Sequence, residues 1–393
     1  MAIVAASALI GAAFMGSTLV TPLYPLYEQR FGFSKITLTL VYATYVVGNL
    51  VALVFFGRLS DQLGRRKVAI PAIALAMCSA LLFWFASSTA WLYEARGLSG
   101  FAVGIASGTG TAWLAELYGA SQRRRATVMA TVANMIGIAI GPLIGGLLAQ
   151  YSSRPLVLPF VAYVALLAAT ALAILLWPPE TVSRAVALRD VDLRPRVGVP
   201  PEIRARFVAP AVTAFACFAL TGFYYALIPS LLRETLGIGN LAVAGAVVFE
   251  LVATVIVVLL LARRLPSQSG MFAGLFALFP SLGVLVAAQL FKSMPLLLIA
   301  SAFAGASLAL GYRGGLQVVN DIAPPDRRAE VVSSYFVTCF VGNSVPVVGV
   351  GILSTVYDAT TALVALSCVL ALMAVAALLV GNATSRRAYA HRS

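Results

Sequence analysis

The chain consists of long apolar runs separated by short polar connections. Twelve runs are present, and each has the roughly 20 mostly apolar residues that an α-helix needs to cross a bilayer. Strands of a membrane barrel are about ten residues long and alternate in polarity, so the runs predict helices. The expected spans are 3–24, 36–56, 68–88, 91–116, 127–149, 156–177, 208–231, 241–262, 270–291, 295–319, 329–353 and 360–380.

One connection is longer and more polar than the others. Residues 178–207 hold six arginines, four acids and five prolines. This composition predicts a linker between two six-helix halves, residues 1–177 and 208–380, with residues 381–393 as a cytoplasmic tail. A short amphipathic helix around Ser183–Asp190 is one option for part of the linker.

A weak internal repeat supports the two halves. Residues 124–128, with the sequence RRATV, recur as residues 327–331, RRAEV, each between the fourth and fifth run of its half. The expected fold class is therefore an all-α membrane protein with twelve transmembrane helices in two pseudo-symmetric bundles. Duplicated halves are typical of transporters whose substrate site lies between the halves near the membrane midplane.

Composition and charge agree with a membrane protein. Hydrophobic residues make up 61% of the chain and charged residues 10%, whereas a soluble domain carries roughly 25% charged residues. The net charge of +13 comes from basic residues in short loops, so the lipid bilayer and not nucleic acid is the expected partner. With the N-terminus inside, twenty basic residues face the cytoplasm and five face outside. This bias predicts a multi-pass cell-membrane protein with both termini in the cytoplasm.

Residue types that serve enzymes and metal sites are scarce. Cys78, Cys217, Cys339 and Cys368 lie singly in apolar runs and are interpreted as small core residues, and His391 is the only histidine. No catalytic cluster, metal site or cofactor is expected. A membrane-embedded enzyme is a remote alternative to a transporter.

The connection between the second and third runs carries the most specific motif, GRLSDQLGRRK at residues 57–67. Gly57 permits close helix approach, and Gly64 supplies freedom at a turn. Asp61 is one acid among four cations, and it can pair with an arginine or cap the next helix. A plain positive-inside loop explains the arginines, but not the glycines and the acid at these spacings.

This loop resembles the most diagnostic motif of the major facilitator superfamily, G-x-L-x-D-x-x-G-R-R/K, at every core position. In that family the loop aspartate and arginine join an acid at the cytoplasmic end of the fourth helix. The resemblance implies a charge network that closes a cytoplasmic gate. Its expected members are Gly57, Asp61, Gly64, Arg65, Arg66 and Glu116. The equivalent loop of the second half, residues 262–266, lacks the acid and the glycines, so gating is expected to be asymmetric.

Small residues line one face of the fifth run, and a proline kinks it. The run resembles the motif G-x-x-x-G-P-x-x-G-G, which marks proton-coupled antiporters, chiefly drug exporters, within the same superfamily. The matching residues are Gly137, Gly141, Pro142, Gly145 and Gly146. The resemblance implies export in exchange for protons, which are the expected coupling ion.

Proton coupling requires a titratable group within the membrane. Many drug–proton antiporters carry an acid in the first helix, but the first run here has none. Glu250, near the middle of the eighth run, is the leading candidate, because an intramembrane carboxyl is costly and is functional by default. A neutral glutamic acid bound to a neighbouring helix is the structural alternative. Tyr45 aligns with Glu250 in the repeat, and Asn134 is another polar residue at depth.

Arg96 lies inside the fourth run and is followed by Gly97, Gly100 and Gly104. This spacing resembles the fourth-helix motif of the family, an arginine followed four residues later by glycine. An arginine within a span costs about 2.5–3.5 kcal/mol, so it needs a partner or a water-filled cavity. Snorkelling to the outer surface is the alternative.

Aromatic residues are the expected lining of a substrate cavity. The candidates are Tyr42, Tyr45, Phe223, Tyr224 and Tyr225. The structural alternative is an aromatic belt at the membrane interface, which Tyr24 and Tyr27 are expected to form. An aromatic cavity with little charge favours an apolar or amphiphilic substrate, cations included.

Together these patterns predict a secondary transporter that exports a small amphiphilic molecule by alternating access, in exchange for protons. An importer, acting as a proton symporter or a uniporter, is the alternative, because the first-helix acid is absent. The two halves are sufficient for a functional monomer.

Overall fold

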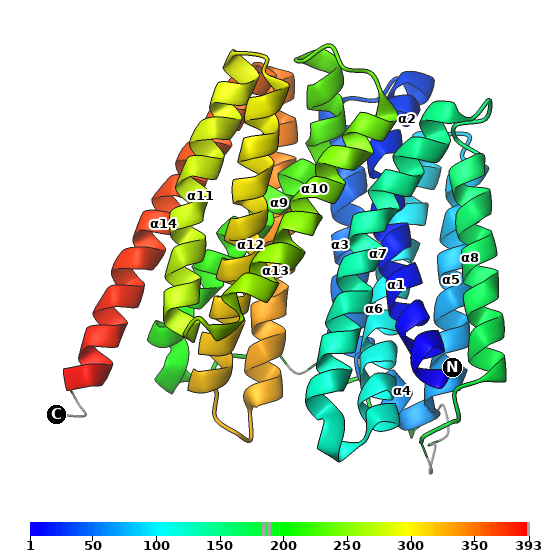
Figure 1. Ribbon diagram of the computed structural model, residues 1–393, viewed down its shortest axis with the longest axis vertical. Helices are drawn as coiled ribbons and strands as arrows, with labels where there is room; N and C mark the ends of the chain where they lie inside the picture. Colours follow the sequence, from blue (N-terminus) through cyan, green and yellow to red (C-terminus); the bar gives the residue numbers. More distant parts are fainter. Residues whose placement is uncertain (183–185, 187–189, 196, 391–393) are drawn as a thin grey trace. The chain divides into compact units, whose positions relative to one another are not determined.

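The structure is a computed structural model that describes residues 1–182, 186, 190–195 and 197–390. Every regular element in these residues is helical, and twelve of the helices have at least 18 residues (Figure 1). The all-α fold predicted from the apolar runs is therefore confirmed. The short helix considered around Ser183–Asp190 falls largely outside the described residues.

The helices follow the order expected from the apolar runs. The first half forms α1 (Ala2–Leu19), η1 (Thr21–Leu23), α2 (Tyr24–Phe31), α3 (Lys35–Phe56), α4 (Leu59–Leu63), α5 (Arg65–Trp84), α6 (Thr89–Tyr118), η2 (Ala120–Gln122), α7 (Arg123–Tyr151) and α8 (Leu158–Leu176). The second half forms η4 (Pro201–Ile203), α9 (Arg204–Glu234), α10 (Leu241–Leu261), η5 (Ala262–Arg264), α11 (Ser267–Leu290), α12 (Met294–Ile322), α13 (Arg328–Val356) and α14 (Ala359–Ala390).

Eleven helices of the described chain are long and apolar enough to cross a membrane by length and composition. The expected fourth span forms α6, which has 30 residues but does not reach the same hydropathy. Its glycines, serines and threonines lower the mean hydropathy of the helix without interrupting it.

Two helices end at residues other than those expected. The first span was expected to reach residue 24, but α1 ends at Leu19 and η1 follows, with Pro22 inside it. Proline lacks the N–H that would continue the helical hydrogen bonds. The last span was expected to end at residue 380, but α14 continues to Ala390, so the expected tail is helical through Ala390. No proline follows residue 380, and a loss of apolar character by itself does not stop a helix.

The described residues form two compact units. Unit 1 comprises Met1–Phe33, Leu40–Pro195 and Asn240–Phe249, and unit 2 comprises Ser34–Thr39, Arg196–Gly239 and Glu250–Ser393. Two helices therefore contribute to both units, since the first turn of α3 belongs to unit 2 and the first half of α10 belongs to unit 1.

Polar contacts explain these two exchanges. In unit 2, Lys35 Nζ at the start of α3 lies 2.6 Å from Glu234 Oε1 at the end of α9. In unit 1, the backbone N–H of Leu241 at the start of α10 donates to Gln150 Oε1 of α7 at 2.8 Å. Each contact ties one end of a helix to the opposite half of the sequence.

Each unit is built around one central helix. In unit 1, α1 packs against α5, α6, α7 and α8, and in unit 2, α9 packs against α11, α12, α13 and α14 (Figure 1). These two helices are the most buried of the candidate spans. Both are the first helix of their half, so the packing agrees with a duplicated bundle.

The cysteines show where hydropathy misleads. Cys217 and Cys339 are buried, as expected for core residues, but Cys78 and Cys368 are exposed, so the expectation is wrong for these two. A helix surface that faces lipid is as apolar as one that faces the protein interior, and an apolar run therefore does not reveal which face is buried.

Candidate functional site

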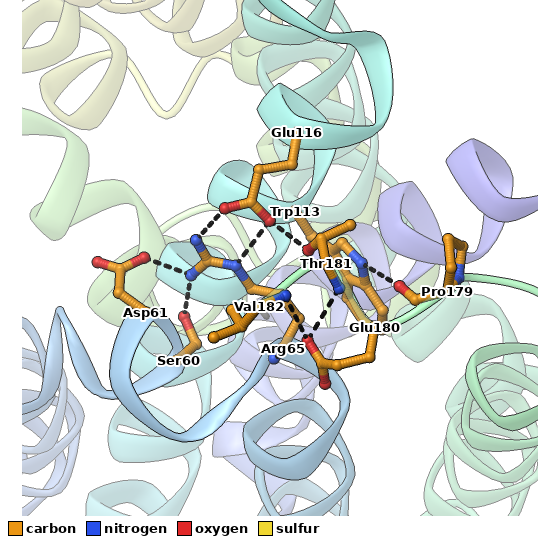
Figure 2. A network of polar contacts seen from close by, with 9 residues as sticks. All are labelled: Ser60, Asp61, Arg65, Trp113, Glu116, Pro179, Glu180, Thr181 and Val182. Carbon is orange, nitrogen blue, oxygen red and sulfur yellow. Dashed lines mark hydrogen bonds and ion pairs between the residues drawn. The ribbon is translucent and has the colours of Figure 1, made fainter. Parts of the chain in front are cut away.

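Arg65 is the centre of a polar network at the start of α5 (Figure 2). Its side chain is 5% exposed and forms a bidentate ion pair with Glu116 at the end of α6, with Nη2–Oε1 at 2.5 Å and Nε–Oε2 at 3.1 Å. Arg65 Nη1 lies 2.5 Å from Asp61 Oδ1 and donates to Ser60 Oγ at 2.7 Å. Bidentate arginine–carboxylate pairs are among the strongest charge-assisted contacts, so the network can lock α4, α5 and α6 together.

Gly64 sets the chain direction at this network. Its φ of 111° lies in a region that favours glycine, and it places the first N–H groups of α5 beside the linker. Of the two roles open to Asp61, the structure shows the pairing with arginine. The cap of α5 comes from another residue.

That residue is Glu180, which the sequence analysis did not single out. Its Oε1 accepts the backbone N–H of Arg65 at 2.8 Å (Figure 2). Its Oε2 accepts the backbone N–H of Arg66 at 3.0 Å. Burial raises the pKa of Glu180, but hydrogen bonds from backbone N–H groups outweigh burial and hold the pKa below its usual value. An acid directly after Pro178 and Pro179, at the end of the sixth run, was the signal available in the sequence.

Other residues at the start of the linker lie against the same network. Trp113 Nε1 donates to the carbonyl of Pro179 at 3.1 Å, and Arg66 Nη2 donates to the carbonyl of Pro178 at 2.6 Å. The Thr181 hydroxyl donates to Glu116. The first residues of the linker are thus an ordered part of unit 1.

The second half has a much weaker counterpart. Ser267 at the start of α11 donates one hydrogen bond, 3.2 Å long, to Asp321 at the end of α12. Arg313, which lies within an expected span, reaches the loop after α10 and donates to the carbonyls of Ala262 and Arg263. The polar contacts at the starts of α5 and α11 are therefore unequal: Arg65 forms ion pairs, whereas Ser267 forms one hydrogen bond and Arg313 caps backbone carbonyls.

The glycines of the α7 motif are packing positions. A Cβ on Gly137 would lie 2.3 Å from the carbonyl oxygen of Gly11, and one on Gly145 would lie 2.2 Å from that of Leu19, so both face α1. A Cβ on Gly146 would lie 2.4 Å from the carbonyl oxygen of Leu241 in α10. The motif therefore lets two neighbouring helices approach the backbone of α7 within unit 1.

Arg96 of α6 lies in a cage of tyrosines inside unit 1. Its guanidinium carbon lies 5.3 Å from the ring centre of Tyr24, 5.8 Å from that of Tyr42 and 5.3 Å from that of Tyr45. Nε donates to the Tyr24 hydroxyl at 2.6 Å, and Nη1 donates to the carbonyl of Ser17 at 2.6 Å. The side chain is 0% exposed, so it does not snorkel to a surface.

The charge of Arg96 is not neutralised by any described carboxylate, and its Nη2 is buried with no hydrogen-bond partner. Glu94 is close in sequence, but its side chain is exposed. A charged side chain at membrane depth costs about 2.5–3.5 kcal/mol, and a buried donor without a partner adds about 1–3 kcal/mol. Three aromatic faces recover part of this cost, because each cation–π contact contributes about 0.5–2 kcal/mol.

Tyr24 and Tyr27 are not interfacial, so the expectation of an aromatic belt is wrong for both. They are 1% and 0% exposed, and the Tyr27 hydroxyl donates to the carbonyl of Phe83 at 2.8 Å. The break between α1 and α2 at Pro22 redirects the chain, so that these rings pack within unit 1. Both tyrosines lie near the end of an apolar run, where aromatic residues are usually interfacial, so the sequence did not indicate that they are buried.

Glu250 is held by two hydroxyl groups in unit 2. Its Oε1 lies 3.2 Å from Thr254 Oγ1, and its Oε2 is in short contact with Ser301 Oγ of α12. Ser301 Oγ also lies 2.9 Å from the carbonyl oxygen of Leu298. A hydroxyl has a single proton to donate, so Ser301 serves both acceptors only when Glu250 is protonated and donates to it. No described lysine or arginine pairs with Glu250, which also suits a neutral carboxyl.

The remaining polar candidates are Tyr224, Tyr225 and Asn134. Tyr224 is fully buried, and its hydroxyl, which has no hydrogen-bond partner, lies within electrostatic range of Glu250. Tyr225 is half-buried on the next position of α9, which points about 100° away around the helix. Asn134 on α7 has a buried Oδ1 without a hydrogen-bond partner. The structure thus places Tyr45 against Arg96, whereas the Tyr224 hydroxyl forms no hydrogen bond with Glu250.

Comparison with known proteins gives a consistent family. A family model described as the Major Facilitator Superfamily matches residues 6–345. Multidrug resistance protein 2 of Bacillus subtilis (strain 168) is 28% identical over 159 residues, which are 40% of this chain and 39% of that protein. The quinolone resistance protein NorA of Staphylococcus aureus is 27% identical over 142 residues, 36% of each chain. The matches therefore cover less than half of these relatives.

Solved structures agree on the fold. A bacterial homologue of the human lysosomal transporter Spinster, in an inward-facing and unoccupied conformation, superimposes with a TM-score of 0.77 at 14% identity, over 97% of this chain and 96% of that chain. The nucleoside transporter NupG, as a D323A mutant, superimposes with a TM-score of 0.76 at 12% identity, over 97% of this chain and all of that chain. At these identities the likeness concerns the fold alone.

Proposed function

The chain belongs to the Major Facilitator Superfamily, and we propose that it exports small amphiphilic molecules in exchange for protons. Membership of this family makes it a multi-pass membrane transporter and not an enzyme. The names of the relatives, multidrug resistance and quinolone resistance proteins, support export. The glycine–proline motif of α7 supports the same direction. The proposal places the protein in the plasma or bacterial inner membrane, acting as a monomer with both termini in the cytoplasm.

The contacts of Glu250 carry the proposal of proton coupling. The hydroxyl of Ser301 is fully satisfied when Glu250 holds a proton, and no described cation stabilises the ionised form. Loss of the proton leaves Ser301 facing two acceptors with one donor. Binding and release of a proton therefore change the contact between α10 and α12, which links protonation to helix movement.

In this proposal the network around Arg65 is the cytoplasmic lock. Asp61 and Glu116 hold its guanidinium from two helices, and Glu180 holds the first turn of α5. The weaker contact between Ser267 and Asp321 supports an asymmetric gate, with the bidentate arginine–glutamate pair between α5 and α6 of the first half.

A proton gradient is a sufficient energy source. One charge moved through about 100 mV releases about 2.3 kcal/mol, which supports a roughly fifty-fold concentration ratio of substrate. No nucleotide or other cofactor is needed for gradients of this size.

Transport in proteoliposomes tests the proposal. With the purified protein and a panel of fluorescent amphiphiles, an imposed pH gradient is expected to drive substrate movement against the proton flux. Glu250→Gln is expected to abolish the dependence on the gradient, because glutamine cannot carry the proton. Glu94→Gln, at an exposed acid, is the matched control and is expected to transport like the wild type.

Transport that ignores the pH gradient, or a Glu250→Gln variant that behaves like the wild type, would overturn this mechanism. Substrate that accumulates in the same direction as the protons would show the alternative, a symporter that imports its substrate.

A further inference from the structure

The guanidinium of Arg96 has an N–H donor group without an acceptor. Nε is used by the Tyr24 hydroxyl and Nη1 by the carbonyl of Ser17, but Nη2 is enclosed within unit 1 and has no partner. The guanidinium is planar, and its donors form a fixed fork that matches a carboxylate. Arg96 thus has its cation–π contacts with three rings, but its Nη2 lacks a hydrogen-bond acceptor.

The surroundings of Arg96 restrict what can complete it. Its neighbours are neutral: a backbone carbonyl, a hydroxyl and the rings of Tyr24, Tyr42 and Tyr45. An additional cation would be repelled by the guanidinium, and a neutral acceptor would leave the charge uncompensated. An anion supplies both the missing acceptor and the missing charge, while the rings offer apolar faces to the rest of the molecule.

We propose that Arg96 and its three tyrosines bind the carboxylate of an aromatic or otherwise amphiphilic anion, which is a substrate of the transporter. The proposal rests on the transport function proposed above and narrows its substrate class. It excludes the cations that the sequence analysis included among the amphiphilic substrates, because the buried full charge in the cage is positive.

Access of the anion requires the cage to open, because Arg96 is fully enclosed in this structure. Tyr42 and Tyr45 both lie on α3, so a displacement of this one helix moves two of the three rings away from the guanidinium.

Three probes with the same aromatic body test the charge preference: 2-naphthoate, 2-naphthalenemethanol and 2-naphthylmethylammonium. Binding to the purified wild-type protein is measured by equilibrium dialysis and by the shift of the thermal unfolding midpoint. We expect 2-naphthoate to bind at least tenfold more tightly than the neutral or cationic probe. Chloride and acetate at the same ionic strength identify binding of any small anion, because they lack the aromatic body.

Substitutions assign the preference to Arg96. Arg96→Gln is expected to weaken the binding of 2-naphthoate at least tenfold and to leave the binding of the neutral probe unchanged. Arg96→Lys is expected to retain part of the preference for the anion, because lysine keeps the positive charge but lacks the planar fork of donors. Arg313→Gln is the matched control. Arg313 lies within a candidate span, its side chain caps backbone carbonyls, and its loss should leave naphthoate binding as in the wild type.

Several outcomes would overturn the proposal: no binding of 2-naphthoate to the wild type, equal binding of the three probes, competition by chloride that is as strong as that by naphthoate, or an Arg96→Gln variant that still prefers the anion. The wild-type charge series does not depend on any variant folding. Failure of the proposed proton coupling is distinguishable from these outcomes: the Glu250→Gln variant would then transport like the wild type, while the wild-type protein still binds 2-naphthoate.

Discussion

At the scale of single residues, a hydroxyl from α1 pairs with the backbone carbonyl that Pro142 leaves without a partner in α7. Pro142 has no N–H, so the carbonyl of Ile138 one turn earlier loses its helical partner. Thr18 Oγ1 lies 3.2 Å from that carbonyl oxygen and supplies a donor. Gly141 leaves room for this contact, because a Cβ there would lie 2.3 Å from Thr18 Oγ1. The proline and the glycine of the motif therefore act together with a residue on another helix.

Replacing Thr18 by valine removes the hydroxyl and preserves the shape of the side chain. We expect the free energy of unfolding to fall by about 1–3 kcal/mol, because a buried carbonyl loses its donor. The thermal unfolding midpoint in detergent measures the effect. Thr131→Val is the control, since the Thr131 hydroxyl is exposed and bonds to its own helix at Thr127. The control should change stability by less than about 0.5 kcal/mol, and an equally small effect at Thr18 would contradict its role.

At the scale of helices, the spacing between α3 and α6 determines whether the Arg96 cage exists. A Cβ on Gly100 would lie 1.9 Å from the carbonyl oxygen of Tyr45 and 2.9 Å from the backbone nitrogen of Asn49. Both atoms belong to the α3 backbone and cannot rotate away. Gly100, four residues after Arg96, thus positions α3, and α3 carries two of the rings around the guanidinium.

Gly100→Ala is expected to force α3 away from α6 and to lower the free energy of unfolding by about 1–3 kcal/mol, as overpacked interfaces do. Gly108→Ala on the same helix is the matched control, because the nearest atom to its Cβ would be the carbonyl oxygen of Gly57 at 3.7 Å. Alanine favours a helix by about 1 kcal/mol over glycine, so the control should be neutral or more stable. Thermal unfolding midpoints compare the two, and equal midpoints would contradict the packing argument.

Helix positions followed from the sequence, but helix faces did not. Hydropathy records how apolar a stretch is and not which neighbour each side meets, so Tyr24 was assigned to the membrane interface although it packs against Arg96. Glycine spacing was more informative, because a close approach needs missing side chains on one face. The glycines at 137, 141 and 145 indicated a contact face, but the partner helix α1 emerged only from the structure.

At the scale of the whole chain, the duplicated order of helices and the loop motif could be read from local patterns. The charge network could be read in part, since Asp61, Arg65 and Glu116 were expected together and lie within ion-pair distance. Glu180 could not, because its role depends on where the linker passes. The described residues of the linker up to Pro195 belong to unit 1, so this part of the linker is both a connection and part of the first bundle.

Acidification offers a test of this attachment. The pKa of Glu180 is lowered in the folded protein by backbone N–H donors, which outweigh the effect of burial. The ionised carboxylate therefore stabilises the fold at pH values above the pKa of an unfolded chain, and this contribution is lost as the pH falls through the lower, folded-state pKa. Glu180→Gln should remove the same contribution at neutral pH and have less effect in acid.

We expect Glu180→Gln to lower the free energy of unfolding by about 0.5–1 kcal/mol at pH 7, a small value because the side chain is exposed and screened. The difference from the wild type should shrink between about pH 5 and pH 3, as followed by thermal unfolding midpoints in detergent. Glu202→Gln, at an exposed acid farther along the linker, should show neither effect. A Glu180→Gln deficit that is constant with pH would mean that the carboxylate charge does not hold the linker to α5.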